Sequence, residues 1–570
     1  MISAKGKSRI FRYLGFNKKR LAFLFVLNGL QAVMTSGLAL VYGALVNSVA
    51  EGAKVDALIH DSVLALVYSL VTAGLGIFIH IFSNFYFHNM RYSMMRDVFA
   101  KIVNSSYEDI SSEDSSHYYD TLTNDVNQST SSMWNVVNVF KQVIMVVSSF
   151  VAAVILNWWI ALVMVGFTVL LGVMPLFIKK PLDKANDELS KSNKAFALVA
   201  KENLQGVSII KSFSAERHTN EFIFERTNSL LSGHKKTTRI DAAAAGAASI
   251  VSSFSIISLV ALTCYAVIIG EVKIGAVLSI VQIGMAFYGN VQQVANYMVW
   301  ILGCKSYRDK VWRILGSNAE EEEADSDFAF KDTVTLNNVS FSYQDADRKV
   351  LDGFTYSFEK GKKYLVLGRS GSGKSTLLKL LARFYSGYEG DIVMDGANYA
   401  DIKEKNITKV VAIAQQNCFI FKRPLSENID FLATGDKERL AEAVRLSALT
   451  DFVGLLPDGL NSVVDEEVTQ VSGGEKLRIN LARAYYKGGD ILLLDEVTSA
   501  LDKTTSAIVE NNLLSLKDKT LINVCHKFND STLEKYDGIL VIESGKLVAA
   551  GSFDDLKADP VLLSYRDIEE

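Results

Sequence analysis

The sequence has 570 residues, of which 49% are hydrophobic and 21% charged, and a formal net charge of -4 at pH 7. A chain of this length exceeds one ordinary hydrophobic core, so two large units are expected. The charge balance has no overall basic character, which argues against a general nucleic-acid binder. The four cysteines stand without CxxC spacing, which argues against a zinc site or a disulfide framework.

Long apolar tracts fill the first half of the chain. Asp, Glu, Lys and Arg are absent from residues 21–50, 62–90, 142–178, 242–270 and 274–304. The third tract is broken by Asn157-Trp158-Trp159, a polar and aromatic group that suits a tight hairpin at a membrane interface. Since a membrane span needs about 20 apolar residues, the sequence predicts six transmembrane helices.

The charges between the tracts predict an orientation in the membrane. Basic residues precede the first tract, and the long segments 91–132 and 179–241 carry further ones. These segments are expected on the cytosolic side, with short outward connections near residues 51–57, 157 and 271–273. Both termini are then cytosolic. The first 20 residues are too polar for a signal peptide core, so the first tract is expected to be a retained membrane helix.

The composition changes after about residue 304. An acidic run, Glu320-Glu321-Glu322-Glu323-Ala324-Asp325, precedes a region in which short apolar runs alternate with charged and glycine-rich stretches. Such a charge run is typical of a solvated linker. The sequence therefore predicts three parts. They are a six-helix transmembrane domain with two long cytosolic extensions over residues 1–312, a linker over 313–330, and a water-soluble domain over 331–570.

A predicted phosphate-binding loop follows a strand-like run in the second half. The run Tyr364-Leu365-Val366-Leu367 leads into GRSGSGKST, which fits GxxxxGK[ST] and precedes a helix-forming stretch. Glycines let backbone N–H groups turn toward phosphate oxygens, and the helix adds its positive end. Lys374 is expected to pair with β- and γ-phosphate oxygens, and Ser375 to ligate Mg²⁺. The predicted nucleotide-binding residues of the loop are Gly368, Ser370, Gly371, Gly373, Lys374, Ser375 and Thr376.

Two carboxylates follow another strand-like run. Ile491-Leu492-Leu493-Leu494 ends in Asp495 and Glu496, which places both acids at the phosphate end of a parallel sheet. Asp495 suits Mg²⁺ or its water shell, and Glu496 suits a base that polarises the attacking water. Together with the loop, these residues predict hydrolysis of ATP with Mg²⁺.

The stretch Val471-Ser472-Gly473-Gly474-Glu475 resembles the signature motif of the ATP-binding cassette family. By the same resemblance Gln416 corresponds to the Q-loop, Asp502 to the D-loop, His526 to the switch histidine, and Tyr343 to the aromatic residue that stacks on adenine. The resemblance implies that Gln416 and His526 act with Glu496, and that Gln416 joins Ser375 and Asp495 at Mg²⁺. It also implies nucleotide contacts from Ser472, Gly473, Gly474 and Asp502.

Some of these assignments have alternatives. Gln416 is preferred to Gln415 because of its spacing to Ile420-Phe421, Tyr343 could pack within a strand, and His526 could be an ordinary loop histidine. Glu475 departs from the glutamine that is usual at the end of the motif. The Ser-Gly-Gly core is kept, so its phosphate contact is expected to persist, with the added charge able to tune affinity.

The resemblance covers nearly the whole chain. The membrane half is similar to the exporter type, in which residues 202–216 resemble the pattern near the second coupling helix and residues 107–125 are a looser match. The implied fold is an α-helical membrane domain of six transmembrane helices plus an α/β P-loop NTPase cassette. Because cassettes of this family pair head to tail across ATP, a second half-transporter is implied, with a homodimer favoured and a heterodimer possible.

These features predict an ATP-driven transporter in a bacterial plasma membrane, with membrane lipid around it and the cassette in the cytosol. The expected activity is export of an amphipathic drug, lipid or peptide. Polar residues of the last span, such as Gln282 and Tyr288, either line a substrate path or bond between helices. The alternatives are the catalytic half of a heterodimeric exporter, an importer of metal chelates on the exporter fold, and a soluble cassette ATPase, which the six spans disfavour.

Overall fold

The structure is a computed structural model that describes residues 13–15, 17–111, 113–316, 325, 327–343, 348–465, 471–525 and 530–566. The chain divides into two compact units. The first comprises Met1–Ile102 and Ser116–Ser317, and the second comprises Val103–Ser115 and Asn318–Glu570. Each unit has hydrophobic clusters of its own.

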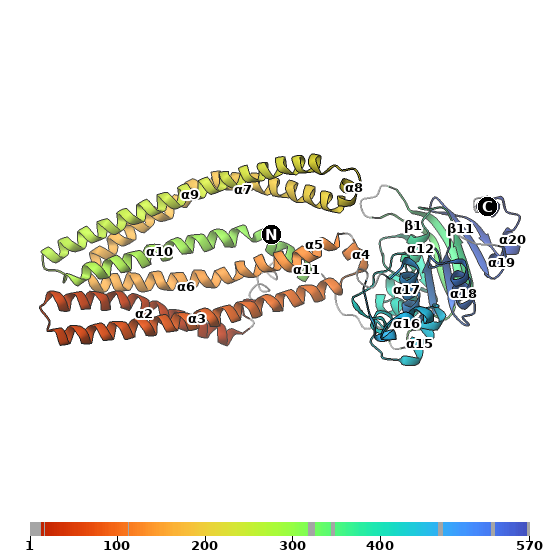
Figure 1. Cartoon of the computed structure of the whole chain (residues 1–570), viewed down its shortest axis with the longest axis horizontal. Coiled ribbons are helices and arrows are strands. Elements are labelled where there is room, and N and C mark those ends of the chain that lie inside the picture. The colour runs from red at the N-terminus through yellow and green to blue at the C-terminus, as the bar shows by residue number, and fades with distance from the viewer. Residues whose placement is uncertain are drawn as a thin grey trace. The chain divides into compact units, whose positions relative to one another are not determined.

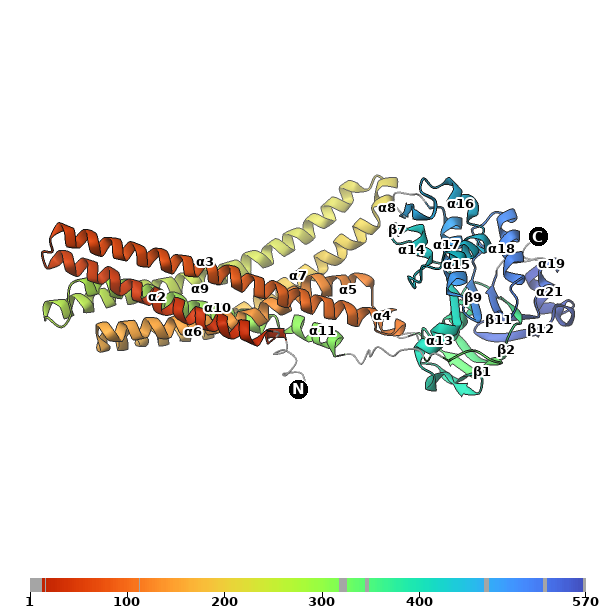
Figure 2. The same cartoon turned by 90° about the horizontal axis from the view of Figure 1, so that it is seen from below.

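Long helices dominate the described part of the first unit (Figure 1). They are α2 (Lys18–Ala50), α3 (Val55–Val103), α6 (Val126–Leu156), α7 (Trp158–Gln205), α9 (Glu216–Ile268) and α10 (Gly275–Gly303). The shorter elements are α5 (Ser115–Asp120), the π-helical turn η1 (Thr121–Asp125), α8 (Val207–Ser212) and α11 (Lys305–Leu315). Helices α7 and α9 run side by side and diverge from the others toward α8, as Figures 1 and 2 both show.

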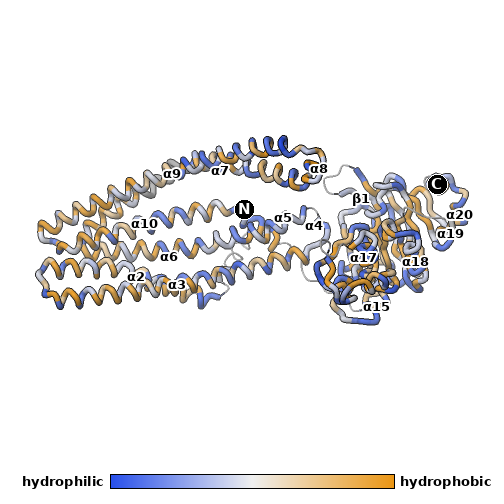
Figure 3. The backbone as a smooth tube through the Cα atoms, in the orientation of Figure 1, coloured by the Kyte–Doolittle hydropathy of each residue, from blue (hydrophilic) through white to orange (hydrophobic). Residues whose placement is uncertain are grey.

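Over the residues that the structure describes, four helical stretches are long and apolar enough to cross a membrane. They are α2, α3, the run Ser115–Leu156 and α9. The described apolar stretch of α7 is Trp158–Val169, and α10 contains several Gln and Asn residues that lower its mean hydropathy. At about 1.5 Å per residue, the 53 residues of α9 exceed a hydrocarbon core of about 30 Å. Figure 3 shows α7 and α9 turning from apolar to polar toward α8.

The predicted hairpin at Asn157 is confirmed, since α6 ends at Leu156 and α7 begins at Trp158. The Asn157 Oδ1 accepts a hydrogen bond from the Trp159 backbone N–H at 3.1 Å and so caps α7. The carboxylate of Glu271 accepts hydrogen bonds from Asn157 Nδ2 at 3.0 Å and from Trp159 Nε1 at 2.9 Å. The connection between α9 and α10 is therefore tied to the connection between α6 and α7.

The second unit is built on a six-stranded sheet with the order β12-β11-β3-β10-β9-β6. Its parallel strands are β11 (Gly538–Glu543), β3 (Lys363–Leu367), β10 (Thr520–Val524), β9 (Ile491–Asp495) and β6 (Val411–Ala414), and β12 (Lys546–Gly551) is antiparallel at the edge. Every residue of β3, β9 and β10 is buried. This burial explains their continuous apolar sequences, because a parallel sheet is covered on both faces.

Two smaller sheets and a set of helices surround this sheet. The strands are β1 (Thr333–Phe341), β2 (Leu351–Glu359), β4 (Glu389–Met394) and β5 (Ala397–Asn398) in the order β2-β1-β4-β5, and β7 (Arg423–Pro424) paired with β8 (Val463–Val464). The helices are α4 (Tyr107–Ser111), α12 (Lys374–Leu381), α13 (Glu404–Val410), α14 (Leu425–Ile429), α15 (Lys437–Leu446), α16 (Thr450–Leu455), α17 (Gly473–Lys487), α18 (Lys503–Leu514), α19 (Asp530–Leu533), α20 (Phe553–Leu556) and α21 (Pro560–Arg566), with 3-10 turns η2 (Tyr399–Asp401) and η3 (Gly459–Asn461). One face of the large sheet packs on α12 and the four-stranded sheet, and the other face packs on α17 and α18.

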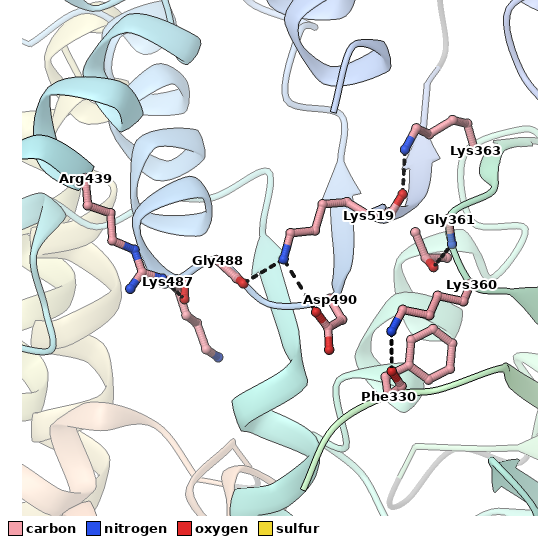
Figure 4. Close-up of polar contacts among 10 residues, drawn as sticks. Phe330, Lys360, Gly361, Lys363, Arg439, Lys487, Gly488, Asp490 and Lys519 are labelled. Atoms are coloured by element: carbon pink, nitrogen blue, oxygen red, sulfur yellow. Dashed lines mark hydrogen bonds and ion pairs between the residues drawn. The ribbon is translucent and has the colours of Figure 1, made fainter. Parts of the chain in front are cut away.

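Lysine side chains close the amino-terminal edge of the parallel sheet (Figure 4). The Lys363 Nζ donates to the carbonyl oxygens of Leu516 at 2.8 Å and Lys519 at 2.5 Å, and the Lys519 Nζ donates to the Gly488 carbonyl at 3.1 Å. Burial lowers the pKa of the Lys363 ammonium. With this edge occupied by structural contacts, the loops at the carboxyl ends of the strands are the ones available for binding.

Candidate nucleotide site

The predicted phosphate-binding loop joins the carboxyl end of β3 to α12. Gly368, Gly371 and Gly373 have φ angles of 157°, 77° and 107°, which glycine adopts far more readily than other residues. A Cβ at Gly368 would lie 2.4 Å from the Ile542 carbonyl oxygen, and one at Gly373 would lie 2.8 Å from the Val350 carbonyl oxygen. The loop thus needs glycine at both positions for space as well as for backbone conformation.

Lys374 is folded into this loop and is 5% exposed. Its Nζ donates to the carbonyl oxygens of Gly368 at 2.7 Å and Arg369 at 2.9 Å. Burial lowers the pKa of the Lys374 ammonium, and the neighbouring Glu496 and Asp495 carboxylates act in the opposite direction. The cation lies at the centre of the loop, where phosphate oxygens would offer it stronger, charge-assisted hydrogen bonds than neutral carbonyls do.

Ser375 lies in the first turn of α12, beside the end of β9. Its Oγ donates to the Asp495 Oδ1 at 3.0 Å, and Asp495 is 7% exposed. Burial raises the pKa of the Asp495 carboxyl, so a cation placed here would favour its ionised form. The Ser375 hydroxyl, the Asp495 carboxylate and the Gln416 amide are the hard oxygen donors that Mg²⁺ takes, together with water and phosphate oxygens. The donor set therefore fits Mg²⁺ bound with a nucleotide.

Glu496 stands directly after β9 and is held in an unusual conformation. Its φ angle is 54°, in the left-handed region that non-glycine residues rarely occupy and that recurs at functional sites. The Gln416 Nε2 donates to the Glu496 Oε2 at 2.7 Å, and the Glu496 backbone N–H donates to the Val524 carbonyl at 3.1 Å. Gln415 is instead held through its backbone carbonyl by Asn480 Nδ2 at 2.7 Å. Gln416 is thus the glutamine whose side chain meets the carboxylate.

Tyr343 follows β1 and lies beside the first turn of α12. Its hydroxyl shares a hydrogen bond of 2.9 Å with the Thr376 Oγ1. Its ring meets those of Phe341 and Tyr385 edge to face, with centroids 5.1 Å and 5.3 Å apart. The half-buried ring therefore stands at the margin of the phosphate-binding loop, where an adenine base could stack on it.

The signature residues form the start of α17. The Ser472 Oγ accepts a hydrogen bond from the Glu475 backbone N–H at 3.3 Å, and the Ser472 backbone N–H donates to the Glu475 Oε2 at 2.8 Å. This reciprocal pair is a capping box, which accepts Glu or Gln at its third position. A Cβ at Gly474 would lie 3.0 Å from the Ala500 carbonyl oxygen. The signature therefore packs closely on the segment that leads to Asp502.

Asp502 caps α18. Its Oδ1 accepts hydrogen bonds from the backbone N–H groups of Thr504 at 3.0 Å and Thr505 at 2.9 Å. Hydrogen bonding to Thr505 lowers the pKa of the Asp502 carboxyl. In this structure Asp502 therefore acts as a helix cap, which leaves its predicted role toward nucleotide to be tested.

Hydrogen bonds join the predicted residues in four pairs, which are Ser375 with Asp495, Gln416 with Glu496, Lys374 with Gly368, and Tyr343 with Thr376. The charges of Asp495 and Glu496 also act on Lys374. Ser370 and Gly371 are exposed at the tip of the loop. His526 lies outside the described residues. The sequence reasoning did not single out Ser372, whose Oγ is buried without a hydrogen-bond partner within the described part of the chain. Its place inside GxxxxGK was the available signal, and a phosphate oxygen would satisfy this hydroxyl.

Helix α4 belongs to the same compact unit as the sheets and contacts the segment after α12. The Tyr107 ring stacks on Phe384 with centroids 4.4 Å apart and meets Tyr385 edge to face at 5.8 Å. The Glu108 Oε2 accepts hydrogen bonds from the Ser386 backbone N–H and Oγ, both at 2.9 Å. Since Tyr385 also meets Tyr343, aromatic rings connect α4 to the margin of the nucleotide site.

Two family models match the chain. The model for the ABC transporter transmembrane region matches residues 21–291, and the model for the ABC transporter matches residues 351–499. Together they cover most of the chain, which therefore belongs to the ABC transporter family. Within the family it is an exporter-type half-transporter, with a helical transmembrane domain fused to an ATP-binding cassette. It is an integral membrane protein and an ATPase coupled to transport.

Similar proteins include an ATP-dependent lipid A-core flippase of Pseudomonas fluorescens (strain Pf0-1), 27% identical over 509 residues that cover 87% of this chain and 83% of that one. A beta-(1→2)glucan export ATP-binding/permease protein of Bartonella henselae is 25% identical over 569 residues, covering 97% and 93%. A solved structure of a bacterial Atm1-family ABC exporter with ATP bound has a TM-score of 0.83 and 20% identity, covering 97% of this chain and 98% of that one. The solved structure shares the fold.

Proposed function

We propose that two copies of this chain form one ATP-driven exporter of an amphipathic molecule. The observation that carries the dimer is that the sequence has one phosphate-binding loop and one signature. In the described structure the Ser472 side chain bonds within its own helix start. A nucleotide held by one loop alone keeps the other side of its phosphates open to water. The start of α17 in a second cassette would supply the missing donors and a positive helix end.

The site geometry supports a role for each described residue of the catalytic set. The backbone of Gly368–Thr376 and the Lys374 ammonium bind the phosphates, and Tyr343 stacks on adenine. Mg²⁺ bound by Ser375, Asp495 and Gln416 would neutralise charge on the phosphates. Glu496, fixed by Gln416 at 2.7 Å, takes the proton of the attacking water. His526 completes the set, as the family resemblance implies.

The contact of α4 supports a mechanical link between ATP binding and transport. A change at Tyr343 when adenine stacks on it would reach α4 through Tyr385 and Tyr107. The two hydrogen bonds of Glu108 fix α4 on the same surface. The chain runs directly from α3 into α4, so a displacement of α4 would move the end of a membrane-spanning helix.

An amphipathic cargo is supported by the polar residues of α10. The Tyr288 hydroxyl donates to the Met164 carbonyl at 3.3 Å and so bonds between helices. Gln292 and Gln293 are exposed on the same helix, where they are available to a polar group of the cargo. One relative is named for lipid A-core, which favours a lipid with a polar head, and the other is named for a glucan, which is a purely polar cargo. The proposed location is the bacterial plasma membrane, with cassette and termini in the cytosol.

The test is ATP hydrolysis by the purified chain in lipid, compared with Glu496→Gln. We expect activity in the unmodified chain and a loss of about 100-fold or more in the variant, as removal of a catalytic base produces. Glu438→Gln is the matched control, because Glu438 is exposed on α15 and should leave hydrolysis unchanged. An inactive unmodified chain would contradict the homodimer and favour an obligatory second subunit. Full activity in Glu496→Gln would overturn the assigned base.

A further inference from the structure

A cavity of about 340 Å³ opens in the first unit where α2 begins beside α3. Arg20 from α2 and Arg96 from α3 line it together with the polar side chains of Asn17, Asn89 and Ser93. Two arginines thus line one cavity together with residues that carry amide and hydroxyl groups. Such a set of donors matches the oxygens of a phosphate group, which arginine binds with paired N–H groups.

The walls of this cavity are fixed by buried contacts. Tyr86 and Met90 line it from α3 and are 7% and 1% exposed. The Tyr86 hydroxyl donates to the Leu14 carbonyl at 2.6 Å, and the Tyr13 hydroxyl donates to the Asp97 Oδ2 at 2.7 Å. These bonds fasten Tyr13 and Leu14, which precede α2, to α3, so contacts among described residues hold the walls of the cavity in place.

Few negative charges of the described residues lie near the two arginines of the cavity. No carboxylate lines it in the described part of the chain. The first turn of α2 contains Lys18, Lys19 and Arg20 and no acidic residue. The Arg96 Nε lies 3.9 Å from the Asp97 Oδ1 with the Arg96 side chain 80% exposed, and a pair so long and so exposed attracts weakly. A bound anion would offset the repulsion among these cations.

The position of the cavity along the helices indicates the source of that anion. Arg20 directly precedes the uncharged tract 21–50, and Asn89 to Arg96 lie where the tract 62–90 ends. Both apolar tracts therefore stop at the level of the cavity, which places it at the membrane surface. We propose that this cavity binds a phosphate group presented at the membrane surface, with Arg20 and Arg96 as its anchors.

The test measures binding to the full-length chain in detergent by native mass spectrometry, and so does not depend on the proposed transport cycle. The probes are phosphatidylglycerol, diacylglycerol with the same acyl chains, and inorganic phosphate. We expect the unmodified chain to retain one phosphatidylglycerol and to retain diacylglycerol much less. Arg20→Gln combined with Arg96→Gln should weaken phosphatidylglycerol binding about tenfold or more, because two charge-assisted interactions are lost.

Lys18→Gln combined with Lys19→Gln is the matched control, since it also removes two positive charges, here from the start of α2 and outside the cavity lining. Asn89→Asp adds a negative charge to the lining at constant size, and should also weaken binding. The proposal is overturned if the unmodified chain and all these variants retain phosphatidylglycerol equally. It is also overturned if the unmodified chain retains diacylglycerol as well as it retains phosphatidylglycerol. Displacement of phosphatidylglycerol by millimolar inorganic phosphate would assign the phosphate group to a free ion, and no displacement would assign it to a lipid head group.

Discussion

Glu475 replaces the usual signature glutamine with a charged residue while keeping the helix cap. Its Oε2 accepts the Ser472 backbone N–H at 2.8 Å, a bond that a glutamine oxygen can also accept. We expect Glu475→Gln to leave the melting temperature nearly unchanged and to lower the KM for ATP by about threefold. The reason is that one charge near phosphates across a hydrated interface contributes under about 1 kcal/mol.

The comparison variant is Glu475→Ala, which removes half of the capping box. It should destabilise the cassette by about 0.5 to 1 kcal/mol, as the loss of a capping interaction does. Thermal unfolding and ATP titrations of both variants separate the two effects. An unchanged KM in Glu475→Gln would show that the charge of Glu475 does not reach the nucleotide.

Asp495 is expected to make the stability of the nucleotide-free chain depend on pH. Burial raises the pKa of its carboxyl above the unfolded value, so the folded chain holds this proton more tightly than the unfolded chain. Ionising Asp495 therefore lowers the free energy of unfolding. This loss is absent below a pH of about 4, grows as the pH rises through the pKa of the folded chain, and is complete above that pKa. Asp495→Asn should raise the melting temperature at pH 7, with a smaller gain at lower pH.

The control for this prediction is Asp401→Asn, because Asp401 is exposed on the turn η2. Its melting temperature should follow that of the unmodified chain at each pH. Adding Mg²⁺ and ATP should stabilise the unmodified chain more than Asp495→Asn, since the substitution removes an anionic oxygen donor. A lower melting temperature in Asp495→Asn at pH 7 would count against the sign of this argument.

Much of the nucleotide site could be predicted because its residues stand in short motifs next to strands. Lys374 and Ser375 follow β3, and Asp495 ends β9, so the parallel sheet brings them together at one edge. The positive φ of Glu496 and the unsatisfied hydroxyl of Ser372 depend on tertiary structure. The motif GxxxxGK placed Ser372 in the loop, but neither the burial of its hydroxyl nor the backbone conformation of Glu496 can be read from a local pattern of residue types.

At the scale of elements, the packing of α4 on Phe384 and Tyr385 allows a test of the proposed coupling between ATP hydrolysis and transport. Tyr107→Ala removes a ring stacked 4.4 Å from Phe384 and in contact with Tyr385. An aromatic pair contributes about 0.5–1.5 kcal/mol beyond its buried area, so the contact should weaken without unfolding the cassette. We expect hydrolysis without cargo to stay within about twofold while cargo-stimulated hydrolysis and transport in vesicles fall about tenfold.

Tyr119→Ala provides the matched control for this prediction. Tyr119 lies on α5, in the same extension, and is 71% exposed. Its loss should leave both stimulated and unstimulated hydrolysis unchanged. Equal losses in the two variants would mean that the extension is merely destabilised, and unchanged stimulation in Tyr107→Ala would remove α4 from the coupling route.

The long helices illustrate what hydropathy can and cannot predict. Tracts free of charge located the membrane-spanning parts of α2, α3 and α9 and the hairpin at Asn157. Hydropathy did not predict the pairing of α7 with α9, because that pairing depends on shape and on contacts distant in sequence. It also did not predict the aromatic contact of α4, since Phe384 and Tyr385 lie far from Tyr107 in the chain.

At the scale of the whole molecule, a dimer with shared nucleotide sites predicts complementation between two inactive chains. Lys374→Ala disables the phosphate-binding loop, and Ser472→Ala disables the signature. A homodimer of either variant therefore has a defect in both of its nucleotide sites. A mixed dimer has one site with both defects and one site with neither. With random mixing, about a quarter of all nucleotide sites should be intact, because about half of the dimers are mixed and each mixed dimer has one intact site out of two.

The measurement is ATP hydrolysis after the two variants are co-expressed with different tags and purified through both tags in turn. That selection isolates mixed dimers, in which half of the sites are intact. The control is a second mixture, in which a chain that carries both substitutions is co-expressed with the unmodified chain. Each mixed dimer of this second mixture has one defect in each of its two sites. Activity in the first mixture and little in the second requires that each site takes its loop from one chain and its signature from the other. Activity in the second mixture and little in the first would place the loop and the signature of each site on a single chain.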